Sequence, residues 1–257
     1  MQTKAIISHI SNWLKDYVIK SNTKGFVVGI SGGIDSAVTS TLIAKTGMPL
    51  LCVEMPIHQQ ETQVKRGVNH IKWLKAKFKN VRSTNIDLTS IFDDFIKKLP
   101  KTTIDNDLAL VNTRARLRMT TLYYFAGVNN YLVVGTGNKV EDFGIGFFTK
   151  YGDGGVDISP IADLLKTEVY TIGEELGIIK DIINAAPTDG LWEDDKTDEY
   201  QIGATYPELE WAMGYKGNKD NLISREKEIL SIYKKLNSTN QHKMHAIPIC
   251  RIPENLK

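Results

Sequence analysis

The sequence lacks most features that would place a protein outside the soluble globular class. Its 257 residues include two cysteines, Cys52 and Cys250, without a CxxC motif or a Cys/His cluster, so we expect neither a disulfide framework nor a zinc site. No uninterrupted apolar run approaches the roughly 20 residues needed to cross a bilayer. Lys and Arg (32) nearly balance Asp and Glu (30), which leaves no basic surface for broad nucleic-acid or membrane binding. These absences predict a cytoplasmic protein that meets any phosphate-bearing ligand locally.

The sequence does contain short apolar runs that alternate with longer amphipathic segments. The runs predict strands over residues 26–30, 50–55, 81–86 and 131–135. Helical spacing predicts helices within the first 20 residues and over 34–45, 61–78, 88–99, 107–127, 166–176, 206–213 and 221–236. Because strand, helix and strand in succession form the parallel crossover unit, we expect an α/β fold, a doubly wound parallel sheet flanked by helices. The length suits one domain over residues 1–257.

Two segments lack this periodicity. Residues 143–157 carry five glycines, which is long for an unstructured connection unless it binds something, and we interpret it as a functional loop. Residues 186–201 are rich in Asp, Glu, Thr and Gly and show no face for a core. We expect this second segment to be mobile and to act as a lid.

A glycine-rich loop stands between the first predicted strand and the following helix. It comprises Gly29, Ile30, Ser31, Gly32, Gly33, Ile34, Asp35 and Ser36. Glycines let backbone amides approach an oxyanion, and the helix N-terminus adds N–H donors and partial positive charge, so the loop predicts a phosphate site. A Walker A loop would need a lysine, and a Rossmann fingerprint would need glycines where Ser31 and Ile34 stand. Asp35 would repel phosphate without a bridging cation, which predicts Mg²⁺. The plain alternative is a glycine-rich turn with Asp35 as a helix N-terminal charge.

Two motifs carry a resemblance to known families. The loop sequence SGGIDS resembles the pyrophosphate-binding loop of the N-type ATP pyrophosphatases, which adenylylate a substrate by cleaving ATP between its α and β phosphates. Residues 146–155, GFFTKYGDGG, closely resemble a segment of the NAD synthetases within that superfamily. Further short matches at 114–119, 135–136, 186–188 and 242–243 extend the resemblance over almost the whole chain. It implies an adenine nucleotide alpha hydrolase-like fold.

The resemblance also implies roles for individual residues. The ATP contacts would be Gly29 to Ser36, Thr136, Lys166 and Thr188, and the Mg²⁺ ligands Asp35 and Glu141. The deamido-NAD contacts would be Arg116, Lys150, Asp157, His242 and Lys243, of which the last two fall in a predicted polar tail. Thr136 follows a predicted buried strand, where ligand sites of α/β sheets open, and Lys166 supplies the cation that the loop lacks. Asp153, in the loop beside Lys150, is our candidate proton acceptor for the ammonia step.

One segment departs from the family pattern. Many bacterial members carry the pattern GTDHAAE at this place. When its first two letters are aligned with Gly135 and Thr136, the segment that departs from it is 137–142, GNKVED. Glu141 keeps its place five residues after Thr136, but the stretch from Glu141 to Lys150 is one residue longer than in those members. The departure predicts a variant subgroup.

The activity implied by the resemblance is the ATP-dependent amidation of deamido-NAD with ammonia to NAD, AMP and pyrophosphate, through an adenylylated intermediate. We expect no glutaminase domain within residues 1–257, and therefore free ammonia as the nitrogen donor unless a separate amidase subunit delivers it. The family also implies a homodimer, with the helix over 107–127 either at the interface or in the core. Two alternatives remain at this point: another N-type ATP pyrophosphatase, and a nucleotide-binding module without turnover. The latter would bind ATP but release no pyrophosphate.

Overall fold

The computed structural model describes residues 1–104, 106–187 and 197–257, and its centre is a parallel sheet. The strands within these ranges are β1 (Gly25–Gly29), β2 (Leu50–Glu54), β3 (Val81–Asn85) and β4 (Tyr131–Val133), in the order β3-β2-β1-β4. Phe26 lies opposite Leu50 of β2 and Leu132 of β4. The chain moves outward from β1 to β3 and then returns to the other side of β1, which is the doubly wound topology that the sequence predicts.

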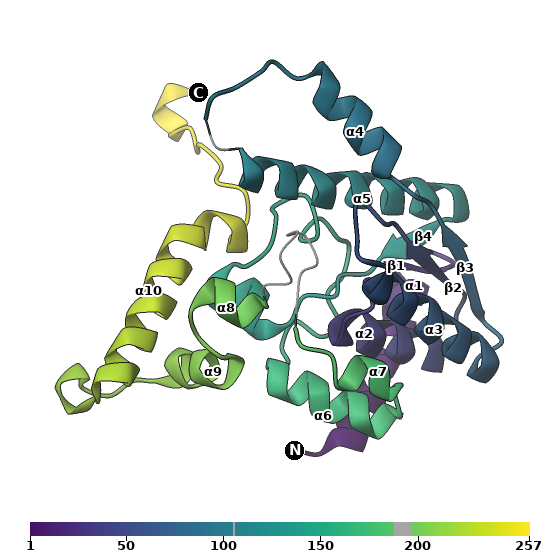
Figure 1. Cartoon of the computed structure of the whole chain (residues 1–257), viewed down its shortest axis with the longest axis horizontal. Helices are drawn as coiled ribbons and strands as arrows, with labels where there is room; N and C mark the ends of the chain where they lie inside the picture. The colour runs from purple at the N-terminus through teal and green to yellow at the C-terminus, as the bar shows by residue number, and fades with distance from the viewer. Residues whose placement is uncertain (105, 188–196) are drawn as a thin grey trace.

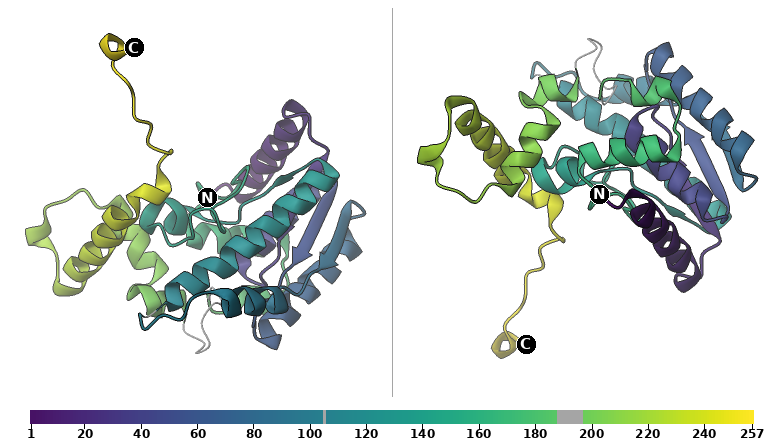
Figure 2. Two further views of the ribbon diagram at one scale, coloured as in Figure 1. Left: turned by 90° about the horizontal axis from the view of Figure 1, so that it is seen from above. Right: turned by 90° about the horizontal axis from the view of Figure 1, so that it is seen from below.

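Helices cover both faces of the sheet (Figures 1 and 2). In chain order they are α1 (Thr3–Lys20), α2 (Ile34–Lys45), α3 (Glu61–Lys77), α4 (Thr89–Lys98), α5 (Asp107–Asn129), α6 (Lys166–Leu176) and α7 (Lys180–Ile183). After them come α8 (Asp198–Ile202), α9 (Tyr206–Gly214) and α10 (Ser224–Met244). Single turns η2 (Lys219–Asn221) and η3 (Glu254–Leu256) and a π-helical segment η1 (Val140–Ile145) complete the described elements.

Alternation along the strands assigns the two faces of the sheet to different cores. Phe26 and Val28 of β1 pack in a cluster with residues of α1, α2, α3 and α6, whereas Val27 packs in a cluster with residues of α4 and α5. Successive side chains of a strand point to opposite faces, so β1 is buried on both sides. A central strand of this kind holds the loop that follows it in a fixed position.

A third apolar cluster lies outside the sheet and joins η1, α9 and α10. In Figure 1 these elements gather on one side of the molecule, away from the strands. The last turns of α10 are fixed by polar contacts, because Asn237 Nδ2 donates to the Gly144 carbonyl (2.8 Å) and Asn240 Nδ2 to the Ile145 carbonyl (2.8 Å). The cluster therefore places η1 between the sheet and the carboxyl-terminal helices.

Two expectations about local structure need correction. The last long helix runs to Met244, so His242 and Lys243 lie in its final turn and not in a polar tail. Its extension depends on the tertiary contacts of Asn237 and Asn240, which the apolar spacing does not report. The segment expected to have no core face ends in helix α8, whose first residue, Asp198, is buried. Among the described residues no helix combines the length and apolar character needed to cross a membrane.

Candidate active site

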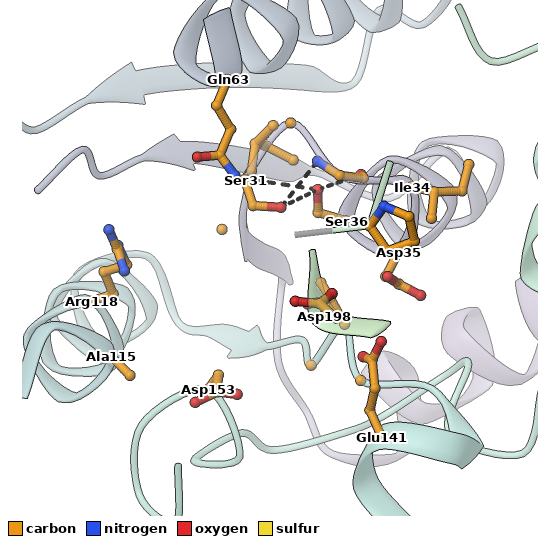
Figure 3. A pocket seen from close by; sticks show the side chains of 18 of the residues that line it. Ser31, Ile34, Asp35, Ser36, Gln63, Ala115, Arg118, Glu141, Asp153 and Asp198 are labelled. Atoms are coloured by element: carbon orange, nitrogen blue, oxygen red, sulfur yellow. Dashed lines mark hydrogen bonds between the residues drawn. The ribbon is translucent and has the colours of Figure 1, made fainter. Parts of the chain in front are cut away.

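A cavity opens beyond the carboxyl ends of β1 and β4, the position at which ligands bind in doubly wound sheets. One wall is the glycine-rich loop, and another is formed by Thr136, Gly137 and η1. Helix α5 faces them across the cavity with Ala115 and Arg118. Figure 3 shows Asp35, Glu141 and Asp153 reaching the same hollow from α2, from η1 and from the loop after η1. All eight residues from Gly29 to Ser36 line the cavity.

The glycine-rich loop is cross-linked by its own hydroxyl groups. The two serine oxygens, Ser31 Oγ and Ser36 Oγ, lie 3.1 Å apart, and Ser36 Oγ donates to the Gly33 carbonyl at 3.0 Å. Gly32 has φ +83°, and a Cβ there would lie 2.5 Å from the Gln63 carbonyl oxygen, so both conformation and space require glycine. The loop leads directly into α2, which turns its N-terminus toward the cavity and suits an oxyanion.

Lys166 lies at the centre of the polar wall, between two carboxylates. Its Nζ is 2.5 Å from Asp35 Oδ2 and 2.9 Å from Glu141 Oε1, and its side chain is only 4% exposed. Asn138 Nδ2 donates to Asp35 Oδ1 at 3.1 Å, and the Tyr206 hydroxyl donates to Glu141 Oε1 at 2.5 Å. Each carboxylate therefore accepts hydrogen bonds from Lys166 and from one neutral side chain, which is Asn138 for Asp35 and Tyr206 for Glu141.

Burial and charge act on these groups in opposite directions. Burial alone lowers the pKa of Lys166, but Asp35 and Glu141 outweigh it and the net pKa is raised, which keeps the ammonium charged. Burial also raises the pKa of Glu141, but the Lys166 charge together with the hydrogen bonds from Tyr206, Lys166 and Asn138 outweighs it, and the net pKa is lowered. For Asp35 burial prevails over Lys166, and the pKa is raised. The hydroxyl of Tyr206 has a raised pKa through burial and then the charge of Glu141, so it remains a hydrogen-bond donor.

The same carboxylates are the residues expected to bind Mg²⁺. Asp35 and Glu141 converge on one point, which the Lys166 ammonium occupies, and they lie beside the phosphate-type loop. Within the described ranges no group of three or more His, Cys, Asp or Glu is arranged to hold a metal. Mg²⁺ commonly takes one or two carboxylates and completes its shell with water and substrate phosphates. The oxygen donors present fit that mode of binding.

Besides Asp198, the carboxylates of Asp153 and Asp142 line the cavity beside this network. Asp153 Oδ1 accepts the backbone N–H of Thr149 at 2.9 Å, and desolvation raises its pKa. Asp142 follows Glu141 on η1, and its pKa is raised well above the usual range by burial first and then by the charges of Glu141, Asp153 and Asp35. This wall of the cavity is therefore acidic, whereas the glycine-rich loop opposite is built for an anion.

The π-helical form of η1 accounts for the extra residue in the chain. A π-turn closes i to i+5 hydrogen bonds and takes one residue more than an α-turn. The segment Val140–Ile145 overlaps the stretch from Glu141 to Lys150, which the resemblance implies to be one residue longer. Asn138 Oδ1 fixes the start of η1 by accepting the backbone N–H groups of Val140 and Glu141, each at 3.1 Å. The insertion is thus absorbed beside the site and not in the loop after it.

The residues implied for deamido-NAD lie apart from this cavity. Arg116 Nη2 donates to the Lys150 carbonyl at 3.3 Å, and Lys150 Nζ donates to the His242 carbonyl at 2.5 Å. Lys243 Nζ donates to the Gly146 and Phe148 carbonyls at 2.6 and 2.7 Å. These four residues therefore gather where the loop after η1 meets the end of α10.

Asp157 belongs to neither group of residues. Its carboxylate accepts the Val133 N–H at 2.8 Å and the Tyr123 hydroxyl at 3.0 Å, so in this structure it ties the loop to β4 and α5. Thr188, expected to contact ATP, lies outside the described residues, as does most of the predicted mobile segment. Thr136 and Lys166, in contrast, line the cavity together with the loop.

Several residues of the site were missed by sequence reasoning. Tyr206 and Asp198, the first residues of α9 and α8, meet at 3.3 Å between the Tyr206 hydroxyl and Asp198 Oδ2, and no motif announces either of them. Asn138 and Asp142 lie in the segment GNKVED, whose departure from the family pattern was the available signal. Arg118 lines the cavity, whereas Arg116 lies outside it, because residues two apart on a helix face different directions.

Comparisons with known proteins agree with the fold and the motifs. The family model described as NAD synthase matches residues 6–247. The NH(3)-dependent NAD(+) synthetase of Mesoplasma florum is 41% identical over 228 residues, covering 88% of this chain and 90% of that protein. Among solved structures, the NMN synthetase of Francisella tularensis has a TM-score of 0.85 at 30% identity and 99% coverage of both chains. The NH3-dependent NAD synthetase of Campylobacter jejuni, in complex with nitrate, has a TM-score of 0.78 at 25% identity, with 98% of this chain and 100% of that chain covered.

Proposed function

The chain belongs to the NAD synthase family, and from that premise we propose that it amidates deamido-NAD with ammonia, consuming ATP and yielding NAD, AMP and pyrophosphate. The observation that carries the proposal is the cavity in which a glycine-rich loop faces the network of Lys166, Asp35 and Glu141. The glycine-rich loop suits the negative charge of a leaving pyrophosphate. The opposite wall supplies a cation and carboxylates that can accept a proton. This division matches a reaction that releases pyrophosphate and then admits ammonia.

The first step activates a carboxylate that ammonia does not attack directly. The nicotinate oxygen attacks the α-phosphorus of ATP, the α–β phosphoanhydride bond breaks, and pyrophosphate leaves into the loop of Gly29 to Ser36. Loop amides, the α2 N-terminus and the Lys166 ammonium stabilise the charge that develops on the phosphates. Thr136 borders the same space at the end of β4, and Thr188 stays a predicted ATP contact. When bound, Mg²⁺ at Asp35 and Glu141 would neutralise phosphate charge.

The second step forms the amide. Ammonia adds to the carbonyl carbon of the adenylate, a proton leaves the nitrogen, and the carbon–oxygen bond to AMP breaks. Asp153, which lines the cavity, is the proposed proton acceptor. A raised pKa brings its carboxyl closer to the range in which a base is effective near neutral pH. We keep Arg116, Lys150, Asp157, His242 and Lys243 as proposed deamido-NAD contacts, in a second cluster beyond the cavity.

We also propose a homodimer located in the cytoplasm. Helix α5 exposes Tyr124 (65%) and Val128 (67%), which lie four residues apart on one face of the helix, an apolar pair that a second copy would cover. Both cysteines are free, and Cys250 is exposed, as suits a reducing compartment. The proposed mobile segment 186–201 would shield the adenylate from water.

The test is product formation by the purified protein with ATP, Mg²⁺ and deamido-NAD, with ammonium or glutamine as nitrogen source. We expect NAD and pyrophosphate with ammonium and no NAD with glutamine. Pyrophosphate without NAD would support adenylylation and contradict the ammonia step. Binding of ATP without either product would favour the nucleotide-binding module, and product with a different acceptor would favour another ATP pyrophosphatase.

A second acceptor has one observation in its favour. The solved structure from Francisella tularensis, at TM-score 0.85, is an NMN synthetase. Amidation that yields NMN requires the corresponding nicotinate mononucleotide, so this compound belongs in a parallel assay. We expect a higher kcat/KM with deamido-NAD, since relatives covering 78 to 100% of this chain at 35 to 42% identity are named NH(3)-dependent NAD(+) synthetases. A higher value with the mononucleotide would reassign the substrate and retain the chemistry.

A further inference from the structure

Arg66 of α3 lies against the glycine-rich loop and lines the cavity. Helix α3 packs on the loop at Gly32, where an added Cβ would lie 3.1 Å from the Gly67 nitrogen and 3.3 Å from Arg66 Cβ. Gln63 and Gly67, four residues apart on one face of α3, are buried, and Arg66 is half-buried beside them. The packing of α3 therefore fixes where the Arg66 side chain begins, next to the proposed oxyanion site.

The Arg66 guanidinium makes one long hydrogen bond. Its Nε donates to the Gly32 carbonyl at 3.4 Å, beyond the usual range for N–H donors. Nothing in residues 1–104, 106–187 and 197–257 forms a hydrogen bond or an ion pair with Nη1 or Nη2. Arginine carries five N–H donors, so the four on these terminal nitrogens are available to a ligand.

The two other cations that line the cavity in the described part of the chain are already engaged. Lys166 is shared by two carboxylates. Arg118 donates from Nε to the Met55 carbonyl at 2.9 Å and from Nη2 to Gln59 Oε1 at 3.2 Å. Arg66 differs from both, because its terminal nitrogens face the cavity without a protein partner.

The place of Arg66 identifies the group that it binds. A guanidinium matches the paired oxygens of a phosphate, which excludes ammonia. Of the two phosphate-bearing substrates, ATP releases its pyrophosphate into the loop, and the proposed contacts of deamido-NAD gather elsewhere, where the loop after η1 meets α10. Pyrophosphate gains charge as the α–β bond breaks, and the loop itself offers only neutral N–H and O–H donors beside the acidic Asp35.

Resting on the proposed function, we propose that Arg66 binds the β- and γ-phosphates of ATP and then the departing pyrophosphate. It does so at the Gly32 end of the loop, whereas Lys166 acts at the Asp35 end. The Nε contact to the Gly32 carbonyl orients the guanidinium, and its two terminal nitrogens donate to phosphate oxygens. Cations at both ends of the loop then share the charge that develops on the leaving group.

The first test is the binding of labelled inorganic pyrophosphate to the intact protein in the presence of Mg²⁺, measured by equilibrium dialysis. Arg66→Gln removes the charge but keeps an amide N–H that can donate to the Gly32 carbonyl. We expect its Kd for pyrophosphate to rise about 10- to 100-fold, as for loss of charge-assisted hydrogen bonds. Arg66→Lys keeps the charge without the planar fork, so its Kd should fall between those of the wild type and Arg66→Gln.

The matched control is Lys65→Gln. Lys65 is the preceding residue of α3, is exposed, and is not among the residues that line the cavity. The substitution removes one positive charge from the same helix, and its Kd for pyrophosphate should equal that of the wild type. Thermal unfolding of all three variants checks that the fold is retained.

The second test separates the ligands by steady-state kinetics. In Arg66→Gln the KM for ATP should rise about 10- to 100-fold, while the KM values for deamido-NAD and ammonium stay within about twofold. Product inhibition by pyrophosphate should weaken by a similar factor, whereas inhibition by AMP should not change. A residue that only supports the loop would not produce this split between the two products.

Three outcomes would overturn the assignment. Wild-type affinity for pyrophosphate in Arg66→Gln would reduce Arg66 to a donor that holds the Gly32 carbonyl. A raised KM for deamido-NAD with an unchanged KM for ATP would assign the guanidinium to the other phosphate-bearing substrate. An equal loss of affinity in Lys65→Gln would show that the overall charge of α3 matters and not a contact from Arg66.

Failure of the proposed function is distinguishable from failure of this inference. A wild-type protein that binds pyrophosphate through Arg66 but forms no NAD would refute the proposed function and support the phosphate contact. NAD formation by Arg66→Gln with an unaltered KM for ATP would refute the phosphate contact alone.

Discussion

Two ion networks in this chain have similar nitrogen–oxygen distances, but one is buried and the other is exposed to solvent. Lys166 bridges Asp35 and Glu141 at 2.5 and 2.9 Å with a side chain that is 4% exposed. Arg225, in α10, bridges Glu208 and Glu228 at 2.8 and 3.0 Å with a side chain that is 45% exposed. Each network places one cation between two carboxylates, so bond length and composition do not distinguish them.

Burial is what separates the two. Charges removed from water pay a desolvation cost that their mutual attraction must offset, and the remaining interaction is strong because little solvent screens it. An exposed network is screened and contributes little. The buried network lies in a cavity beside an anion-binding loop, whereas the exposed one joins the start of α10 to α9. A buried network that costs free energy and lines a cavity is the better indicator of a functional site.

The largest expected effect is that of Lys166→Met, which removes the cation of the buried network. Removing this cation leaves Asp35 and Glu141 buried without a countercharge, and we expect the free energy of unfolding to fall by about 3 kcal/mol. Loss of a charge that stabilises the phosphates should lower the rate of pyrophosphate formation by about 10²- to 10³-fold. Urea denaturation and a pyrophosphate assay measure the two effects.

The matched control is Arg225→Met, which removes a cation between two carboxylates at the surface. It should leave pyrophosphate formation unchanged, because no residue of its network lines the cavity. Comparable losses of activity in the two variants would contradict the distinction between the networks. So would a Lys166→Met protein with near-normal turnover.

A buried titratable group without an ion-pair partner among the described residues shows the effect of burial when no opposite charge offsets it. His70 is fully buried, its Nε2 lies 2.9 Å from Ser40 Oγ, and desolvation lowers its pKa to about 4. In the unfolded chain the pKa of histidine is about 6.5. Because the folded value lies below the unfolded one, protons bind preferentially to the unfolded state, and stability is lost as the pH falls from about 6.5 toward 4.

The size of this effect follows from the same two values. Between pH 7.5 and 5 His70 should contribute a loss of about 2 kcal/mol in the free energy of unfolding. The variant His70→Gln keeps a hydrogen-bonding group near Ser40 and does not titrate, so its stability should fall by that much less over the interval. His9→Gln, on the exposed side of α1, is the control and should keep the wild-type slope. Parallel slopes for wild type and His70→Gln in urea denaturation would refute the assignment.

The sheet and the glycine-rich loop were predictable because their signals are local. The run from Phe26 to Ile30 marks a strand buried on both faces, and the glycines that follow mark the turn into α2. Lys166 and Glu141 were identified by resemblance, and the structure brings both to Asp35. The sheet and the loop thus follow from residue type, order and spacing, whereas the roles of Lys166 and Glu141 follow from the resemblance.

The remainder of the site depends on which distant segments meet. Tyr206 lies 65 residues after Glu141, and nothing in the sequence around either residue reports their hydrogen bond. The extra residue before Lys150 was visible, but its absorption as a π-turn, and the contact of Asp142 with Gly137 that results, required coordinates. Sequence reasoning detected the irregularity and not its consequence.

The smallest expected effect is that of Arg225→Ala in the exposed network. Arg225 also donates from Nη2 to the Gly203 carbonyl at 3.3 Å, so the variant loses a contact to the end of α8 as well as two ion pairs. Because the network is exposed, we expect only a small fall in the free energy of unfolding, well below that of Lys166→Met. About 1 M salt should remove most of that difference, since screening acts on exposed pairs. Urea denaturation at low and high salt measures it, with Lys97→Ala on the exposed pair with Asp94 as a control for a single surface bridge. A larger loss that persists in high salt would mean that the surface network shares the character of the buried one, and the contrast between the two would fail.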